Sequence, residues 1–307
     1  MYMKILPLLL LSLSASLNIA EALPKPKASY FNFTHVSDDG SFYASYHGND
    51  KNHQYVDKGD ENHSDKIYGG SNAALGQFPF MVIIHRLAGK GQYFVCGGSI
   101  LSSRWVLTAG HCIANKPQKF FVVFGVVDKS GFGYDYITGD GVSMISTQGA
   151  LHPGYGEGQH DIGLLYMPKN IPFSDTVQPI RLAGKSYQRQ SFASQMGHIY
   201  GWGKDEQDGR AISKLKYGRV PIISNGMCRR TWNVDYTHVC TDSSTGQDVC
   251  QGDSGGPLVV LEEDDEPLQV GIVSYGDAGC PSSRPSVFTR VSAYTTWIKR
   301  VTGIDYE

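Results

Sequence analysis

From Ile67 to the C-terminus, short apolar runs alternate with clusters of Gly, Pro, Asn and Ser, and this alternation constrains the fold more than any other feature. The runs are rich in Val, Ile, Phe and Tyr, residues that suit pleated strands, and most are too short for helices. They are Phe80–Ile84, Trp105–Ala109, Phe120–Val127, Ile162–Tyr166, Leu258–Leu261 and Val270–Tyr275. Many short strands with frequent turns are typical of all-β sandwiches and barrels.

The C-terminal end is the exception to this β pattern. Tyr294, Trp297, Ile298 and Val301 follow the spacing i, i+3, i+4 and i+7, which places them on one face of a helix. Ser292 is the residue that this pattern predicts as the N-cap. A C-terminal helix is therefore expected beside the β domain.

The first residues resemble a secretion signal. Lys4 gives a positive start, Ile5–Leu13 is an almost unbroken apolar run, and Ala-Glu-Ala at 20–22 supplies a small-x-small cleavage site. A membrane anchor is the alternative, but a membrane span needs about 20 apolar residues. We expect residues 1–22 to be a signal peptide and the mature protein to be secreted, soluble and without a membrane partner.

Residues 23–66 differ in composition from the rest of the chain. They contain no cysteine and few aliphatic residues, and they are rich in Asp, Asn, Lys, His, Ser and Tyr. Such a stretch cannot bury enough apolar surface to offset its chain entropy, so we expect it to be disordered. The tripeptides Asn-Phe-Thr at Asn32 and Asn-His-Ser at Asn62 predict glycosylation.

Charge and cysteine content exclude several classes of function. The net charge of -2 gives no basic surface for nucleic acid. In a secreted chain the six cysteines are expected to form disulfides rather than a metal site, and no CxxC pair is present. Spacing alone cannot choose among their pairings. The acidic run Glu262–Glu266 lies between two apolar runs and predicts a solvated hairpin loop rather than a calcium site. We expect no metal and no cofactor.

The strongest local motif is Gly-Asp-Ser-Gly-Gly-Pro at 252–257. A serine flanked by glycines can lie on a tight turn that other backbone segments approach closely. Backbone N–H groups there can converge on one point and stabilise an oxyanion. A serine hydroxyl is a weak nucleophile, however, so Ser254 needs a neighbouring base.

A histidine and an aspartate supply the groups that such a serine needs. His111 follows a β-like run within Thr-Ala-Gly-His-Cys at 108–112, and Asp161 begins Asp-Ile-Gly-Leu-Leu at 161–165. An aspartate at the start of an apolar strand is expected to be partly buried, where its charge needs a partner. Each residue alone is more often structural. Together, in a secreted β-rich chain, Ser254, His111 and Asp161 indicate a nucleophile, a base and an orienting carboxylate.

These motifs make residues 67–307 resemble the chymotrypsin-like (trypsin-like) serine proteases. The family's motifs occur in its order: Ile-Tyr-Gly-Gly at 67–70, then the motifs at 108–112, 161–165 and 252–257, then Ser-Tyr-Gly at 274–276. The resemblance implies an all-β fold of two six-stranded antiparallel barrels with a C-terminal α-helix. It places the active site in the cleft between the barrels.

By this resemblance the chain is a serine endopeptidase. Ser254 attacks the scissile carbonyl, His111 relays the proton to the leaving amine, and Asp161 fixes the His111 tautomer. The N–H groups of Gly252 and Ser254 form the oxyanion hole. The resemblance also implies three disulfides: Cys96 with Cys112, Cys228 with Cys240, and Cys250 with Cys280.

The resemblance further implies a zymogen. Cleavage after Lys66 would free an ammonium on Ile67, which inserts and pairs with Asp253 and so orders the oxyanion loop. Tyr68 departs from the usual small β-branched residue at its position. The implied partners are protein or peptide substrates, an activating trypsin-like protease and protein inhibitors, and we expect a monomer.

By the same resemblance, four residues carry the expected specificity. Asp248, six residues before Ser254, corresponds to the pocket floor that pairs with Arg or Lys. Gly276 would keep one wall open, and the backbone of Ser274 and Gly276 would bind substrate as an added strand. Ser286 stands where trypsin has glycine and could narrow the pocket or bond to Asp248.

Preferential cleavage after Arg or Lys is therefore expected, and chymotrypsin-like or relaxed specificity is the alternative. An inactive homologue that acts as a binding protein would need a broken triad. An α/β-hydrolase would place the serine before the aspartate and histidine in the chain, which is not the order here.

Overall fold

The structure, a computed structural model, describes residues 67, 69–89, 92–115, 118–129, 141–156, 158–204, 212–277, 279–280 and 282–307. For Ala88, Gly89, Gln92 and Asp264 it describes the backbone alone. The expected signal peptide, Tyr68 and the expected pro-segment with Asn32, Asn62 and Lys66 lie outside the described residues.

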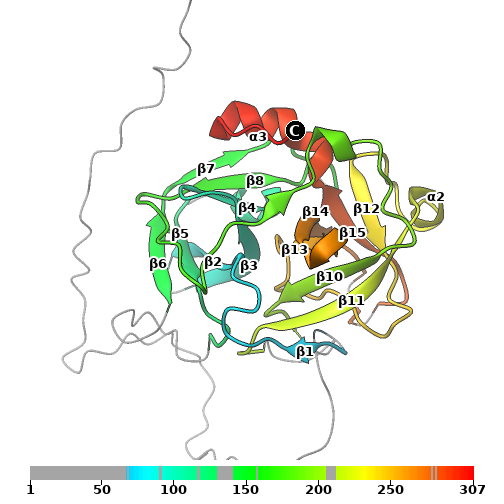
Figure 1. Cartoon of the computed structure of the whole chain (residues 1–307), viewed down its shortest axis with the longest axis horizontal. Helices are drawn as coiled ribbons and strands as arrows, with labels where there is room; N and C mark the ends of the chain where they lie inside the picture. Colours follow the sequence, from blue (N-terminus) through cyan, green and yellow to red (C-terminus); the bar gives the residue numbers. More distant parts are fainter. Residues whose placement is uncertain are drawn as a thin grey trace, which may run out of the picture. The chain divides into compact units, whose positions relative to one another are not determined.

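Seven strands form the first sheet, in the order β6-β5-β2-β3-β4-β8-β7 with antiparallel pairing throughout (Figure 1). The strands are β2 (Met81–Gly89), β3 (Gln92–Ile100), β4 (Trp105–Thr108), β5 (Phe120–Phe124), β6 (Val142–Ser146), β7 (Gln148–Leu151) and β8 (Gly163–Tyr166). The two strands at the ends of this order, β6 and β7, are separated by Thr147 alone. One bent strand thus begins and ends the ring, which makes the first sheet a six-stranded barrel.

The second sheet closes by hydrogen bonds. Its neighbouring strands pair in the order β11-β10-β13-β14-β15-β12, and β12 pairs again with β11. Two short strands are added to this ring: β1 pairs with β11, and β9 pairs with β14. The strands are β1 (Ser71–Asn72), β9 (Arg181–Leu182), β10 (Met196–Gly201), β11 (Lys216–Ile223), β12 (His238–Thr241), β13 (Pro257–Leu261), β14 (Pro267–Tyr275) and β15 (Ser286–Arg290). The two-barrel fold expected from the sequence is confirmed.

Apolar side chains fill both barrels and the contact between them. In β5 every residue is buried, because one face lines the barrel and the other is covered by neighbouring segments. One buried polar contact joins the barrels: the Ser99 hydroxyl of β3 donates to the Gln269 side-chain oxygen of β14 at 2.7 Å. Tyr200 and Trp202 of the second half belong to the same apolar cluster as the first barrel. The main apolar cluster therefore contains residues of both halves.

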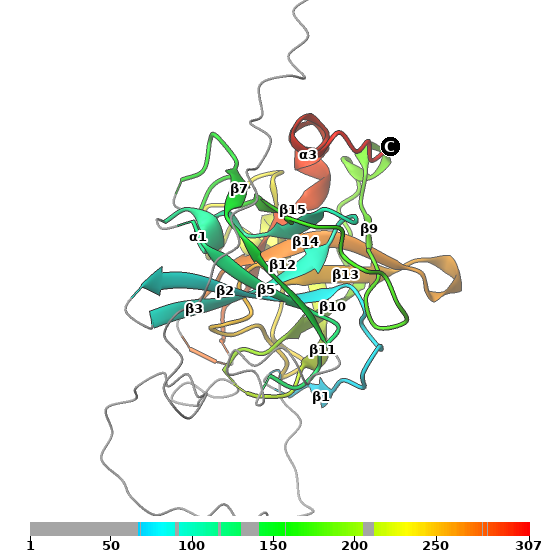
Figure 2. The same cartoon turned by 90° about the vertical axis from the view of Figure 1, so that its left-hand side faces the viewer.

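Most strands lie where the sequence predicts them, with shifted ends. β5 stops at Phe124 rather than at Val127, because Gly125 has a φ of 70° and turns the chain away from the extended conformation. The acidic run forms the expected hairpin turn between β13 and β14, which projects from the barrel and contains the 3-10 turn Glu263–Asp265 (Figure 2).

The C-terminal helix, α3, spans Thr295–Thr302 and ends at Gly303. The prediction of Ser292 as its N-cap is wrong. A 3-10 turn, Val291–Tyr294, precedes the helix, so the α-helical hydrogen bonding begins later than the apolar pattern suggests. Ser292 is buried within that turn, and its hydroxyl has no hydrogen-bond partner among the described residues. None of the helices in the described ranges is both long and apolar enough to span a membrane.

Candidate active site

Strand pairing brings His111 and Asp161 together although fifty residues separate them. His111 lies in the one-turn helix α1 (Gly110–Ile113), directly after β4, and Asp161 lies just before β8. β4 and β8 are antiparallel neighbours with Thr108 opposite Gly163, so the end of one strand meets the start of the other. Both residues are therefore placed by the first barrel.

The Asp161 carboxylate is nearly saturated with hydrogen bonds. It accepts from the His111 backbone N–H at 2.8 Å, lies 2.8 Å from His111 Nδ1, and accepts from the Ser274 hydroxyl at 2.5 Å. Its side chain is 7% exposed and that of His111 is 34% exposed. Burial alone would raise the pKa of Asp161, but the bonds and charge of His111 and the Ser274 bond bring it below its ordinary value. Asp161 is therefore an ionised partner for the His111 ring.

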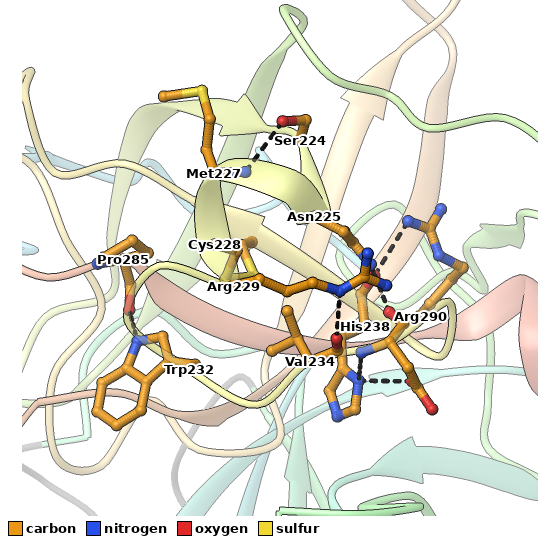
Figure 3. The surroundings of a disulfide bond; sticks show 12 residues. Ser224, Asn225, Met227, Cys228, Arg229, Trp232, Val234, His238, Pro285 and Arg290 are labelled. Atoms are coloured by element: carbon orange, nitrogen blue, oxygen red, sulfur yellow. Dashed lines mark hydrogen bonds and ion pairs between the residues drawn. A yellow bond between two sulfur atoms is a disulfide. The ribbon is translucent and has the colours of Figure 1, made fainter.

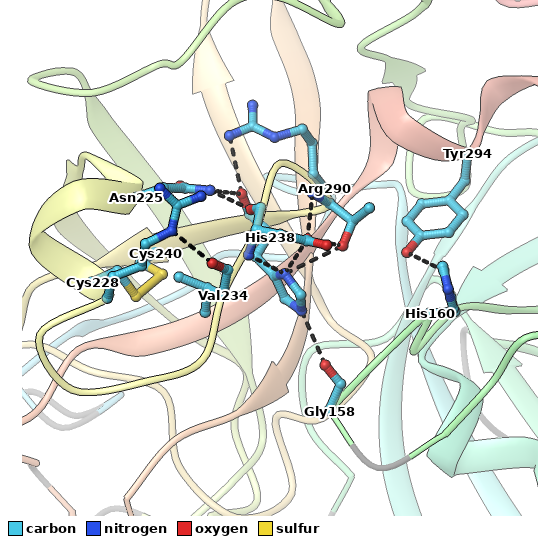
Figure 4. Close-up of polar contacts among 12 residues, drawn as sticks. Gly158, His160, Asn225, Cys228, Val234, His238, Cys240, Arg290 and Tyr294 are labelled. Carbon is cyan, nitrogen blue, oxygen red and sulfur yellow. Dashed lines mark hydrogen bonds and ion pairs between the residues drawn. A yellow bond between two sulfur atoms is a disulfide. The ribbon is translucent and has the colours of Figure 1, made fainter.

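The second barrel holds the segment that carries Asp161. The Thr289 hydroxyl of β15 donates to the Asp161 carbonyl at 2.8 Å. Figure 4 shows two further contacts: His238 Nε2 lies 3.0 Å from the Gly158 carbonyl, and His160 Nδ1 lies 3.0 Å from the Tyr294 hydroxyl. The position of Asp161 thus depends on both halves of the molecule.

Ser254 lies on a glycine turn beside the His111 segment. Its carbonyl accepts from the Gly97 N–H at 2.8 Å and lies 3.7 Å from the sulfur of Cys112, the residue after His111. Gly252 has a φ of 103°, and a Cβ there would lie 3.0 Å from the Gly203 Cα, so only glycine fits. Ser254 and His111 are both half-buried.

All six cysteines are paired as the resemblance implies. The Cys96–Cys112 bond ties β3 to the helix that carries His111. The Cys228–Cys240 bond joins α2 (Asn225–Cys228) to β12, and the chain between them includes Trp232, whose indole N–H donates to the Pro285 carbonyl at 2.7 Å (Figure 3). The bonds therefore brace the segments around the site.

Asp248 is buried and hydrogen-bonded at both carboxylate oxygens. The Ser286 hydroxyl donates to Oδ1 at 2.7 Å, the Val249 N–H donates to Oδ1 at 2.9 Å, and the Ser282 N–H donates to Oδ2 at 3.2 Å. Burial raises the pKa of Asp248 above its ordinary value, against the effect of these bonds. A Cβ at Gly276 would lie 3.3 Å from the Ser286 hydroxyl, so these two residues face each other closely.

Asp253 is the most deeply buried carboxylate near the site. Its Oδ1 accepts from the Gly203 N–H at 2.7 Å and its Oδ2 from the Cys250 N–H at 2.9 Å. Burial raises its pKa to about 7, although these bonds and the charge of Lys129 act in the opposite direction. Ile67 is 2% exposed within the apolar cluster of the second barrel.

An open cavity of about 570 Å³ borders the His111–Asp161 pair. It is lined by His111, Tyr155, Gly158, Gln159, Asp161, Trp232, Asn233, Ser274 and Tyr275. A larger hollow of about 820 Å³ lies on the second barrel and shares no residue with the predicted site. Among the described residues, Cys96, His111 and Cys112 have metal-ligand spacing, but the two cysteines are joined in a disulfide and offer no thiolate.

A histidine paired with a buried carboxylate at the junction of two barrels, beside a glycine-flanked serine turn, defines the two-barrel class of serine endopeptidases. The family model for trypsin matches residues 67–298. The chain therefore belongs to the trypsin family of serine proteases.

Relatives and solved structures agree with this assignment. Serine protease SP24D of Anopheles gambiae is 32% identical over 239 residues, which cover 76% of this chain and 80% of that protein. Serine protease 1 of Drosophila melanogaster is 34% identical over 242 residues, 78% of this chain and 87% of that protein. Coagulation factor IX of Cavia porcellus is 33% identical over 237 residues, which cover 76% of this chain and 80% of that protein. The solved structure of HL collagenase matches with a TM-score of 0.68 at 29% identity, covering 78% of this chain and all of that one.

The sequence patterns did not predict the second-barrel side chains that contact Asp161 or the segment just before it. They assigned Ser274 a backbone role only, whereas the Ser274 hydroxyl bonds to the Asp161 carboxylate. The pairing of β14 with β15 shifts register between Val273 and Tyr275, so a bulge at Ser274 is associated with this contact. Thr289 and His238 carried no motif that would have marked them.

Proposed function

We propose that this serine endopeptidase uses Ser254 as nucleophile, His111 as general base and Asp161 as the group that orients His111. The 2.8 Å contact between the Asp161 carboxylate and His111 Nδ1 carries the proposal. A carboxylate only accepts hydrogen bonds, so Nδ1 must hold a proton and Nε2 is left to accept one. His111 takes the Ser254 proton as the hydroxyl attacks the scissile carbonyl and gives it to the leaving amine, while the Gly252 and Ser254 N–H groups stabilise the oxyanion.

Ser254→Ala tests these roles directly. The variant should bind substrate but lose kcat by about six orders of magnitude, because only oxyanion binding and positioning would be left. It should also escape labelling by a fluorophosphonate that reacts with activated serines. Ser191→Ala, at an exposed serine away from the site, is the matched control and should be labelled like the parent enzyme. Labelling of Ser254→Ala at the parental rate would refute the assignment.

We further propose cleavage after Arg or Lys, with Asp248 as the pocket floor. A buried carboxylate without a cationic partner is costly, and the raised pKa of Asp248 is consistent with that cost. The bond from Ser286 partly satisfies the same carboxylate, which favours the alternative of a relaxed preference. The test is to measure kcat/KM on peptides that differ only in the residue before the cut, which is Arg, Lys, Phe, Leu or Ala. The ratios distinguish an Arg/Lys preference from a relaxed one.

We propose that residues 23–66 form an activation pro-segment removed by cleavage after Lys66. The buried position of Ile67 and the buried charge of Asp253 support this, because a new ammonium at Ile67 would meet an anion that has no full counter-charge. Treatment of the precursor with trypsin should create an N-terminus at Ile67 and a large rise in kcat. Lys66→Gln should block both, and a high activity of the Lys66→Gln precursor would argue against the zymogen.

Secretion completes the proposal: residues 1–22 would be a signal peptide, and Asn32 and Asn62 would carry glycans. The mature enzyme, residues 67–307, would be a monomer that meets protein substrates, an activating trypsin-like protease and protein inhibitors. Secretion of the chain from cultured cells, with a mobility shift on glycosidase treatment that Asn32→Gln and Asn62→Gln abolish, would support this. Retention inside the cell would contradict it.

A further inference from the structure

A lysine of the first half reaches into the second half next to the buried Asp253. Lys129 follows β5 and is half-buried. Its Nζ donates to the Trp202 carbonyl at 2.9 Å, and its backbone N–H donates to the Ser213 carbonyl at 2.8 Å. The Trp202 indole in turn donates to the Val127 carbonyl at 3.0 Å. Lys129 is thus bonded to the second half through both its ammonium and its backbone N–H.

A single peptide group connects this ammonium to the Asp253 carboxylate. The carbonyl of Trp202 accepts from Lys129, and the N–H of the same peptide, at Gly203, donates to Asp253 Oδ1 at 2.7 Å. In a trans peptide the C=O and N–H point in opposite directions. The negative, carbonyl end of the peptide dipole therefore faces the Lys129 cation, and the positive, N–H end faces the Asp253 anion. The peptide therefore couples the two charges although they do not touch.

The charges of the two groups also depend on each other. Burial lowers the pKa of Lys129 to about 8, and the Asp253 charge opposes that shift. Burial raises the pKa of Asp253 to about 7, and the Lys129 charge opposes that shift. His85 also faces Lys129, but burial and the Lys129 charge lower its pKa to about 4, so it is neutral near pH 7. Asp248 acts on Asp253 as a further negative charge.

We propose that Lys129 is a positioning residue for the turn that carries Ser254: through the Trp202–Gly203 peptide it supplies part of the positive charge that the buried Asp253 carboxylate requires. This deepens the proposed function and rests on it, because the ordered turn matters only if Ser254 is the nucleophile. Before cleavage Lys129 is the cation that the structure couples to Asp253. After cleavage the Ile67 ammonium would share that role, so the dependence on Lys129 should be greater in the precursor.

Three substitutions separate charge from shape. Lys129→Gln removes the charge but keeps a donor for the Trp202 carbonyl, Lys129→Met removes both, and Lys129→Arg keeps both. Lys214→Met is the matched control, because Lys214 is an exposed lysine on the neighbouring segment. Its backbone forms an isolated antiparallel β-bridge with Asp128, the residue before Lys129. All four are made in the full chain with Lys66→Gln, so that no Ile67 ammonium forms.

The first readout is amide hydrogen exchange across residues 250–256, which needs no enzyme activity. We expect Lys129→Gln and Lys129→Met to speed exchange there about three- to ten-fold at pH 7, because the buried Asp253 carboxylate then loses part of its counter-charge and the turn around it is less stable. Lys129→Arg and Lys214→Met should match the parent. If Lys129→Gln behaves like the parent, or if Lys129→Arg is as fast as Lys129→Met, the charge has no role and the inference is wrong.

The second readout is the pH dependence of fluorophosphonate labelling, before and after cleavage in chains that keep Lys66. In the precursor, Lys129→Gln should lower the labelling rate at pH 7 about three- to ten-fold and move the acid limb of the profile to higher pH. The loss should be less than two-fold in the cleaved enzyme. An equal loss in both forms would overturn the role before cleavage. If the cleaved parent is not labelled at all, the proposed function fails, while the exchange result still decides the role of Lys129.

Discussion

At the scale of single residues, one hydrogen bond dominates the surroundings of Asp248, the proposed floor of the specificity pocket. Asp248 already accepts three hydrogen bonds, and the Ser286 hydroxyl makes the shortest of them at 2.7 Å. A carboxylate has about four lone-pair sites, so room for a substrate cation is left but is reduced. The Ser286 bond thereby satisfies part of the Asp248 carboxylate, so a substrate cation would gain less by binding there, but it would still gain.

Ser286→Gly should raise kcat/KM for Arg and Lys peptides about three- to ten-fold. The substitution removes a competing donor and the side chain that faces Gly276, and a hydrogen bond to a charged group contributes about 1.5–3 kcal/mol. Peptides with Phe or Leu before the cut should gain less than two-fold. Unchanged values for Arg and Lys would show that Ser286 neither narrows the pocket nor competes for Asp248.

Asp253 should make the precursor less stable as the pH rises. Its folded pKa of about 7 lies above the ordinary value of 3.8, so its contribution to stability is full below about pH 4 and is lost as the pH rises through about 7. The free energy of unfolding of Asp253→Asn should fall with rising pH by up to about 4 kcal/mol less than that of the parent. Urea unfolding at pH 5 and pH 8 measures it, and an identical pH dependence in parent and variant would contradict the expectation.

At the scale of elements, strand ends from both barrels converge on Asp161. β4 and β8 place it next to His111, while β14 and β15 contribute the hydroxyls of Ser274 and Thr289. The bulge in β14 and the strand β15 are therefore part of the site, although neither carries a catalytic group. Misplacement of either strand would move the carboxylate that orients His111.

Thr289→Val should lower kcat about three- to ten-fold with little change in KM. Valine has nearly the same shape but leaves the buried Asp161 carbonyl without this donor, which costs about 1–3 kcal/mol. Thr245→Val is the matched control, because the exposed Thr245 also donates to a carbonyl, that of Arg219, away from the site. An equal effect of both variants on kcat would mean that the Thr289 bond is only structural.

At the scale of the whole molecule, the shared core should make the barrels unfold together. The buried Ser99–Gln269 bond joins them, and the main apolar cluster contains residues of both. Ser99→Ala should lower the free energy of unfolding by about 1–3 kcal/mol, because it leaves the Gln269 oxygen buried and unpaired. Tryptophan fluorescence and circular dichroism should still report one coincident transition in urea.

The double variant Ser99→Ala/Gln269→Leu provides the control for this prediction. It removes the Gln269 oxygen that Ser99→Ala leaves unpaired and should recover part of the lost stability, although the Gly271 carbonyl loses its Gln269 Nε2 donor. Two separate transitions in the parent, or no recovery in the double variant, would show that the barrels are independent or that the bond does not stabilise their contact.

The sequence alone determined the strand-rich domain, the family motifs and the residues expected in the site. These features are written in short stretches of chain: apolar runs between turn residues, and the motifs around His111, Asp161 and Ser254. Local pattern suffices for them because strand formation and glycine turns depend on neighbouring residues. The signal peptide, the pro-segment and both sequons also follow from local composition, and they stay predictions.

Tertiary structure alone decided what surrounds those residues. The hydroxyls of Ser274 and Thr289 on Asp161, and the link from Lys129 through Trp202 to Asp253, join segments far apart in the chain. No local pattern encodes such contacts, because they arise only when the barrels pack and exclude water, which forces each buried charge to find a partner. The late start of α3 has the same origin, since a buried 3-10 turn replaces the expected N-cap.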